Sequence, residues 1–359
     1  MLYLTRMDFV SVNEFEGQKG IGILRADLDV NVKDGQVFGG ERLDAAIATL
    51  SLLLQKGAEK ILVIGHIDRP KGKYQESLST KPFVDYLGKN LKAEVNFARH
   101  YPKDKLYVVR EAIEVSSAPV VVLDNIRFWA EEEENDNEFA KELASMALYY
   151  VNEAFGASHR EHSSVVGIPK HVKENGGSLY AGLRFAEEIE NLKKVREDAD
   201  KPLVAILGGA KKDKTEFIEK FKEFSDLVMV VGRLPDFLPD DENRDPKLFI
   251  SKLNPDKEDI TIHSIEKIEQ EVARAETIVV AGPVGLYEDG GHSLGTQRVL
   301  TAIANSKAKF KLAGGGDTAK AIDFFNRRDA FDWISVGGGA SLDYLANGTL
   351  PGIEALKHS

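Results

Sequence analysis

Short runs of branched apolar residues alternate with helix-like patterns along most of this chain, and that alternation restricts its fold more than any other feature. Continuous Val, Ile and Leu runs are typical of strands buried on both faces. The runs lie at 22–30, 60–65, 93–97, 119–123 and 150–154 in the first half, and at 203–207, 227–231, 277–281, 309–312 and 333–336 in the second. Helical spacing of apolar residues occurs between them, at 43–54, 81–91, 138–149, 216–224 and 265–274. The chain is therefore predicted to be α/β, with mostly parallel sheets covered by helices on both faces.

A charged helical stretch at 179–197 separates two halves of similar size. A chain of 359 residues is long enough for two domains. We predict an N-terminal domain at 1–178, an interdomain helix at 179–197 and a C-terminal domain at 198–340, each domain a doubly wound, Rossmann-like parallel sheet. The acidic stretch 236–259 is predicted to be loop. We expect a cleft between the two domains, because ligands of parallel sheets bind beyond the carboxyl ends of the strands.

The composition argues against several classes of function. The formal charge of −11 disfavours binding to nucleic acid or to a membrane surface, although it leaves room for a local basic pocket. There is no cysteine, which excludes disulfides and thiol catalysis, and the eight histidines lack metal-ligand spacing. The N-terminus lacks the pattern of a signal peptide, and no apolar run approaches the ~20 residues that span a bilayer. We therefore expect a cytoplasmic protein.

Basic residues follow the predicted strands of the first half. Four arginines, two histidines and two aspartates make up this candidate set: Asp27, Asp29, Arg42, His66, Arg69, Arg127, His159 and Arg160. A single arginine after a strand is usually solvated or ion-paired, whereas several at one sheet edge are typical of a ligand site. Because guanidinium groups bind carboxylate and phosphate oxygens in two-point geometry, the set predicts a small substrate with several negative charges.

Glycine-rich turns follow the strands of the second half, at 207–214, 281–288, 313–318 and 336–341. Any one of them is an ordinary strand-to-helix connection. Together they predict a floor of backbone N–H groups that suits a polyphosphate, because glycine allows close approach and helix N-termini attract anions. Lys211 and Lys214 would add mobile positive charge, Thr318 would donate to a phosphate oxygen, and Asp317 would bind magnesium. The P-loop sequence is absent. An anionic substrate on one domain and a magnesium nucleotide on the other favour phosphoryl transfer.

Several longer stretches match one family. RADLDV, GHIDRPKG, LDNIRF, VNEAFGASHREHSS, AILGGAK, GPVGLYE, GGGDT, VGGGASLDYL and LPGIEAL occur in this order. On these stretches the chain resembles the phosphoglycerate kinases over nearly its whole length. The resemblance implies reversible phosphoryl transfer between 1,3-bisphosphoglycerate and ADP, giving 3-phosphoglycerate and ATP, with Mg²⁺ and in a hinge-bending monomer. It also implies that a tail at 341–359 packs back on the N-terminal domain.

The resemblance assigns roles to the residues at matching positions. The candidate set of the first half would hold phosphoglycerate, and Arg42 would also steady the transferring group together with Lys211, Gly338 and Gly339. The nucleotide would be held by Lys211, Lys214, Gly282, Pro283, Glu288, Gly314, Gly315, Gly316, Asp317 and Thr318, with Asp317 as the metal ligand. Because the acceptor is already a carboxylate or a diphosphate, charge neutralisation and in-line positioning would supply most of the rate.

The chain departs from the family pattern at several positions. Asp29 stands where the family has asparagine, and Lys211 and Lys214 are three residues apart instead of four. Either spacing keeps both side chains on roughly one face of a helix. Ala281 replaces an asparagine, a glycine-rich loop is reduced to Gly232, and the segment that follows it is shortened. These parts normally enclose the adenine and the ribose, so the base preference stays open.

Two alternatives compete with an active phosphoglycerate kinase. The first is a degenerate relative that binds phosphoglycerate or a nucleotide without turnover. The altered lysine spacing and Ala281 favour it, whereas retention of Arg42, Lys211 and Asp317 favours activity. The second is a dinucleotide-dependent dehydrogenase, which is disfavoured because no GxGxxG motif opens the first helix.

Overall fold

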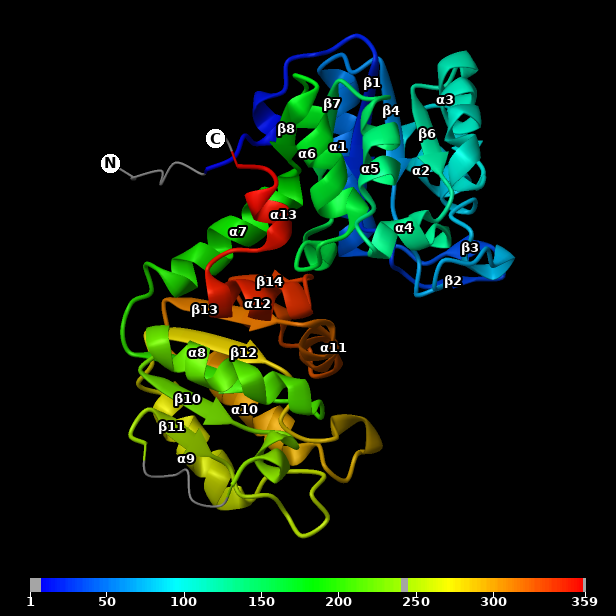
Figure 1. The fold of residues 1–359 in the computed structure, drawn as a ribbon. Helices are drawn as coiled ribbons and strands as arrows, with labels where there is room; N and C mark the ends of the chain where they lie inside the picture. The colour runs from blue at the N-terminus through cyan, green and yellow to red at the C-terminus, as the bar shows by residue number, and fades with distance from the viewer. Residues whose placement is uncertain (1–7, 240–244, 358–359) are drawn as a thin grey trace. The chain divides into compact units, whose positions relative to one another are not determined.

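The computed structural model describes residues 8–239 and 245–357. Contacts within the chain divide it into two compact units. The first unit runs to Glu188 and includes the segment from Leu350 onward, and the second is Ile189–Thr349. Both units are α/β, as predicted (Figure 1). Across the described ranges, no helix combines the length and the apolar composition needed to cross a bilayer.

The first unit is built on a sheet of six strands, in which every neighbouring pair is parallel. In chain order the strands are β1 (Ile21–Arg25), β4 (Lys60–Ile64), β5 (Val95–Ala98), β6 (Val120–Leu123), β7 (Tyr149–Asn152) and β8 (Ser178–Ala181), and their order in the sheet is β5-β6-β4-β1-β7-β8. A short antiparallel ribbon, β2 (Val32–Lys33) with β3 (Gln36–Val37), follows β1.

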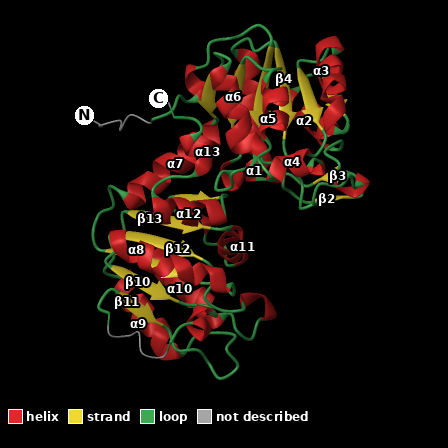
Figure 2. Cartoon of the chain, in the orientation of Figure 1, coloured by secondary structure: helices red, strands yellow, loops and turns green. Residues whose placement is uncertain are grey.

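Helices cover the first sheet on both faces (Figure 2). They are α1 (Glu41–Gln55), α2 (Phe83–Leu91), α3 (Leu106–Val115), α4 (Ala130–Glu133), α5 (Asn137–Ala144), α6 (Ile168–Glu174), the start of α7 (Leu183–Arg196) and α13 (Pro351–Glu354). Leu24, Val63 and Val122 are register partners on one face of the sheet and share a buried core with α1 and α2. Helices α5 and α6 pack against each other.

The second unit repeats this plan with another sheet of six parallel strands. The strands are β9 (Leu203–Leu207), β10 (Leu227–Val230), β11 (Leu248–Ile250), β12 (Thr277–Ala281), β13 (Phe310–Gly314) and β14 (Trp333–Ser335), in the order β11-β10-β9-β12-β13-β14. The helices are α8 (Ile218–Phe224), α9 (Ile262–Val272), α10 (Leu294–Asn305), α11 (Gly316–Phe324) and α12 (Gly339–Asn347). Ile206, Met229 and Val280 share a core with α9 and α10.

The structure differs from the sequence-based prediction at several element boundaries. The stretch 179–197 is not all helix, because Leu179 pairs with Tyr150 in the edge strand β8 and α7 begins only at Leu183. The predicted helix 138–149 ends at Ala144, since Tyr149 already belongs to β7. The predicted loop 236–259 contains β11, which pairs with β10.

The C-terminal segment joins the first unit later than the predicted start at 341. Helix α12 stays with the second unit, and the first unit takes up the chain from Leu350. There the Gly352 N–H donates to the Ser158 carbonyl at 2.9 Å, and Lys173 Nζ donates to the Lys357 carbonyl at 3.1 Å.

Glu153 follows β7 and caps the start of α7. Its buried carboxyl accepts a hydrogen bond from the Phe185 N–H at 3.0 Å and another from the Thr49 hydroxyl. The Thr49 oxygen accepts from the Leu183 N–H at 3.1 Å. Burial raises the pKa of Glu153 to about 8, although these hydrogen bonds lower it. The carboxyl is therefore mostly protonated in the folded chain at neutral pH.

We expect Glu153 to make the first unit less stable as the pH rises. Between its usual pKa of 4.5 and about 8, the unfolded chain loses this proton while the folded chain keeps it. Stability then falls by up to about 1.4 kcal/mol per pH unit. Glu153→Gln removes this slope, so the melting temperatures of variant and parent should change differently between pH 5 and pH 8. Glu111→Gln, on the exposed surface of α3, is the control. If the melting temperatures of Glu153→Gln and the parent change in parallel with pH, the raised pKa of Glu153 is contradicted.

Candidate active site

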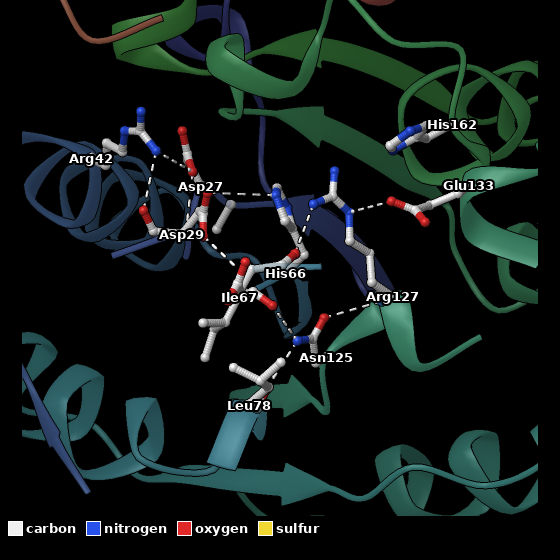
Figure 3. Close-up of polar contacts among 12 residues, drawn as sticks. Asp27, Asp29, Arg42, His66, Ile67, Leu78, Asn125, Arg127, Glu133 and His162 are labelled. Atoms are coloured by element: carbon white, nitrogen blue, oxygen red, sulfur yellow. Dashed lines mark hydrogen bonds and ion pairs between the residues drawn. The ribbon is translucent and has the colours of Figure 1, made fainter. Parts of the chain in front are cut away.

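The basic residues predicted from the sequence come together at the carboxyl edge of the first sheet. We call this set of eight, from Asp27 to Arg160, the basic site. Its members follow four adjacent strands, β6, β4, β1 and β7, except for Arg42, which is the second residue of α1. Figure 3 shows Asp27, Asp29, Arg42, His66 and Arg127 gathered in one region. The parallel order of the strands therefore produces the cluster that their sequence positions predicted.

Arg42 is held by the two aspartates that follow β1. Its Nη1 lies 3.4 Å from Asp27 Oδ1 and donates to the Asp29 carbonyl at 3.1 Å. Asp27 is buried, and burial raises the pKa of its carboxyl although Arg42 lowers it. Asp29 Oδ1 accepts from the Asp68 N–H at 2.9 Å, which ties the loop after β1 to the loop after β4. The Arg42 side chain remains 30% exposed.

Arg127 is the buried arginine of the basic site, with a side chain only 2% exposed. Its Nη1 donates to the Asp68 carbonyl at 2.8 Å, and its Nε lies 3.3 Å from Glu133 Oε1 (Figure 3). Burial, with the charges of Arg25 and Arg160, lowers the pKa of Arg127 to about 10. The guanidinium therefore stays charged at neutral pH.

Arg69 and Arg160 add two positive charges to the basic site, and the carboxylates of Glu133 and Asp29 lie near enough to Arg160 to act toward a higher pKa. Neither forms an ion pair with a residue in the described ranges. Burial and then the charge of Arg69 lower the pKa of Arg160, which means that the two guanidinium groups repel each other. An anion bound between them would relieve that repulsion.

The histidines of this region are neutral. Burial and the neighbouring arginines hold the pKa of His66 well below its ordinary value, that of His159 at about 4 and that of His162 at about 3. At neutral pH the positive charge of the basic site therefore comes from arginine alone, and its histidines are uncharged hydrogen-bonding groups.

The glycine-rich turns of the second unit follow four adjacent strands, β9, β12, β13 and β14. We call this set of turns the glycine-rich site. At β9 and β12 the backbones contact each other directly, because Gly208 and Gly209 donate to the carbonyls of Ala281 and Pro283, each at 3.0 Å. A side chain at Gly208 would lie 2.5 Å from the Pro283 carbonyl oxygen. These N–H groups are used inside the protein, so the predicted floor of donors does not extend over all four turns.

The donors that remain are at the starts of α11 and α12. Gly315 (φ 100°) and Gly338 (φ 55°) precede these helices in conformations that favour glycine. The first backbone bond of α11 runs from Ala319 N–H to the Gly315 carbonyl at 3.0 Å. The N–H groups of Gly316 and Asp317 have no partner within the helix, and the helix dipole favours an anion beside them.

The Thr318 hydroxyl is engaged within the protein. It is buried, it donates to the Gly314 carbonyl at 2.6 Å and it accepts from the Gly282 N–H at 2.7 Å. Thr318 thereby joins the loop after β13 to the loop after β12. The predicted donation from this hydroxyl to a phosphate is at odds with these contacts, because its single proton is already used.

We expect Thr318→Val to destabilise the second unit by about 1–3 kcal/mol, because it leaves the buried Gly282 N–H without an acceptor. Thr318→Ser keeps the hydroxyl and should lose less stability. Urea denaturation, followed by a probe in the second unit, measures the free energy of unfolding of both variants. A valine variant as stable as the parent would show that the bridge between the loops contributes nothing.

The two lysines occupy different settings. Lys211 is exposed and precedes a 3-10 helix (Lys212–Phe217) in extended conformation, so the two lysines do not share the α-helical face assumed from their spacing. Lys214 lies within that helix and donates to the Gly208 carbonyl at 2.9 Å. Burial lowers the pKa of Lys214, whereas the charge of Asp317 raises it. Glu288 is exposed in a 3-10 turn (Tyr287–Asp289), and the Asp317 side chain is 70% exposed.

Comparison with known proteins covers both units. A family model described as phosphoglycerate kinase matches residues 12–238 and 246–348. The chain belongs to the phosphoglycerate kinase family. This assignment replaces the dehydrogenase alternative.

Curated and solved phosphoglycerate kinases match nearly the whole chain. That of Dictyoglomus turgidum is 32% identical over an alignment of 392 residues, covering 95% of this chain and 97% of the relative. That of Borreliella afzelii is 31% identical, covering 98% and 100%. The solved phosphoglycerate kinases of Coxiella burnetii and Pyrococcus horikoshii superpose with TM-scores of 0.81 and 0.78 at 26% and 25% identity, each covering 97% of this chain and 98% of the other.

In this phosphoglycerate kinase family member, the sequence-based candidate set missed several buried polar residues beside the basic site. They are Arg25, Glu132, His162 and Ser164. Arg25 ends an apolar strand, and Glu132 lies in a run of glutamates that resembles a solvated surface. Their burial depends on contacts between distant segments, and local patterns do not report such contacts.

Proposed function

We propose that this chain is an active phosphoglycerate kinase, which transfers a phosphoryl group reversibly between 1,3-bisphosphoglycerate and MgADP to give 3-phosphoglycerate and ATP. The observation that carries the proposal is the mutually repelling pair Arg69 and Arg160, which lies with Arg42 and Arg127 at the edge of the first sheet. Such a site suits an acid that also bears phosphate. Family membership and the two helix N-termini of the second unit support the nucleotide as the other substrate.

In the proposed reaction the arginines bind, orient and neutralise charge. Arg69, Arg127 and Arg160 hold the carboxylate and phosphate oxygens of phosphoglycerate, and the partly exposed Arg42 stabilises charge on the transferring group. Lys211 is exposed and free to move toward the same group. The neutral histidines donate hydrogen bonds. The acceptor needs no deprotonation, so no residue has to act as a strong base. The proposal includes a closed state in which the two ligands meet, in a protein that acts as a monomer.

The glycine-rich site would hold the nucleotide phosphates with the N–H groups at the starts of α11 and α12. Gly282 and Pro283 position the neighbouring loop, and Glu288 is available to the ribose. Mg²⁺ binds proteins through one or two carboxylates and takes its other ligands from phosphates and water. The single exposed carboxylate of Asp317, at the start of α11, fits that requirement. Bound there, the ion would neutralise phosphate charge.

A direct assay tests the proposal. Purified protein is incubated with MgATP and 3-phosphoglycerate, and formation of 1,3-bisphosphoglycerate is followed by coupled oxidation of a nicotinamide cofactor. We expect turnover that requires both substrates and Mg²⁺. ATP, GTP and other nucleoside triphosphates are compared, because the base preference is open. Binding of 3-phosphoglycerate by calorimetry without transfer from any nucleotide would favour the degenerate relative instead.

A further inference from the structure

Arg25 is a fully buried arginine that contacts His66, a member of the basic site. It ends β1, and each of its three side-chain nitrogens has a partner. Nε donates to Ser164 Oγ at 2.8 Å, Nη1 donates to the Ala26 carbonyl at 2.6 Å, and Nη2 lies 2.8 Å from His66 Nδ1. The guanidinium is thus fixed by contacts with three different segments of the first unit.

The contact between Arg25 and His66 determines where the histidine carries its proton. A guanidinium has only donors, so His66 Nδ1 must accept and carries no hydrogen. A neutral imidazole has one N–H, which is therefore on Nε2. That nitrogen lies on the side of Asp29, whose Oδ2 is 3.9 Å away (Figure 3). His66 is thereby a neutral hydrogen-bond donor whose N–H lies on the same side as Asp29, another member of the basic site.

Ser164 and Glu132 hold Arg25 in this position. Since Ser164 Oγ accepts from Arg25, its own proton is directed to Glu132 Oε1 at 2.6 Å, and the Ser164 N–H donates to Glu132 Oε2 at 2.8 Å. The Tyr150 hydroxyl fixes the same serine by donating to its carbonyl at 2.6 Å. Glu132 is fully buried; burial raises the pKa of its carboxyl, whereas the charge of Arg25 and the hydrogen bonds from Ser164 lower it, so that the carboxylate form is the one these neighbours stabilise. Without it, the buried Arg25 would lose one of its nearby carboxylates, Asp27 being another, and removing a partner from a buried charge is strongly unfavourable.

We propose that Glu132 and Ser164 are positioning residues that hold Arg25 against His66, and so fix His66 as an Nε2–H donor to an anionic oxygen of the substrate. The identity of that oxygen, on phosphoglycerate, rests on the function proposed above. The position of the proton on His66 does not, and it is testable without substrate.

The first experiment measures the tautomer of His66 by long-range ¹H–¹⁵N NMR on the ligand-free full chain at pH 7, with the resonance assigned by its loss in His66→Gln. In the parent we expect the Nε2–H form alone. In Ser164→Ala and Glu132→Gln we expect the Nδ1–H form to appear as well, because the Arg25 contact loosens. A parent histidine with its proton on Nδ1, or on both nitrogens, would overturn the proposal.

A pair of substitutions at His66 tests the same point without disturbing the buried residues. The amide nitrogen of glutamine reaches the position of Nε2, whereas that of asparagine reaches only the position of Nδ1. We expect His66→Asn to raise KM for 3-phosphoglycerate about 10- to 100-fold, as for loss of a hydrogen bond to a charged group, and His66→Gln to raise it several-fold less. KM for the nucleotide should stay the same in both. Equal effects of the two substitutions would contradict the proposal.

The outcomes separate this inference from the proposed function. If the parent shows the Nε2–H tautomer but no phosphoryl transfer, the function fails while the proton assignment stands. If phosphoryl transfer is normal but His66 carries its proton on Nδ1, the inference about His66 fails while the proposed function stands. If Ser164→Ala or Glu132→Gln does not fold, circular dichroism identifies the failure, and the two His66 variants then decide.

Discussion

Replacing Arg42 with alanine is expected to lower kcat by about 10²- to 10³-fold, the loss seen when one preorganised donor to a developing charge is removed. KM for 3-phosphoglycerate should change by less than about tenfold. The reason is the place of Arg42 at the edge of the basic site. Its Nη1 contacts Asp27 and the Asp29 carbonyl, and its side chain is 30% exposed. Arg69, Arg127 and Arg160 remain to bind the substrate. Steady-state kinetics in both directions measure the two constants separately.

Arg99 offers a matched control for this substitution. It also follows a strand of the first sheet, β5, but it lies outside the basic site and is exposed. Arg99→Ala should leave both constants near the parent values. If Arg42→Ala instead raises KM as much as it lowers kcat, then Arg42 contributes to substrate binding and has no special role in the transition state.

Asp317→Asn is expected to lower turnover with MgATP by about 10²-fold or more, and to raise the Mg²⁺ concentration needed for half-maximal rate. A metal ion that neutralises phosphate charge contributes several kcal/mol, and an amide is a much weaker ligand than a carboxylate. Calorimetry should show weaker binding of MgATP, with little change for ATP in the absence of the metal. The first unit is untouched, so KM for 3-phosphoglycerate should not move.

Asp323→Asn is the control on the same helix. Asp323 lies near the other end of α11 and pairs with Arg328, with Nε 2.8 Å from Oδ1. Asp323→Asn therefore removes one carboxylate from α11 but leaves the start of the helix, where Mg²⁺ would bind, unchanged. Should Asp317→Asn show the same Mg²⁺ dependence as the parent, the metal is held by other groups and the role given to Asp317 is wrong.

The sequence was sufficient to predict the features that depend on local pattern and strand direction. Apolar runs separated by amphipathic helices require parallel strands, and parallel strands place their following loops at one edge. Arg127 and His66 therefore come together from distant positions, because β6 and β4 are neighbours in the sheet. The glycine-rich turns meet for the same reason at β12, β13 and β14.

Features that depend on contacts between loops could not be predicted in this way. Gly209 and Gly282 look like free phosphate donors in the sequence, but their N–H groups are used by Pro283 and Thr318. The setting of Lys211 and Lys214 depends on the type of helix, and a spacing of three residues does not determine that type. β8 was missed because its Leu179 is continuous with a helical pattern and becomes strand only by pairing with β7.

The return of the chain to the first unit at Leu350 has a consequence for biosynthesis. The Gly352 N–H is hydrogen-bonded to the carbonyl of Ser158, which directly precedes His159 and Arg160. A Cβ at position 352 would lie 2.7 Å from the Ser158 side chain, so the two segments are in close contact. The segment from Leu350 is translated after the whole second unit, yet it packs beside residues translated far earlier. The basic site therefore reaches its final form only after the second unit has been synthesised, although domains can otherwise fold in the order of their translation.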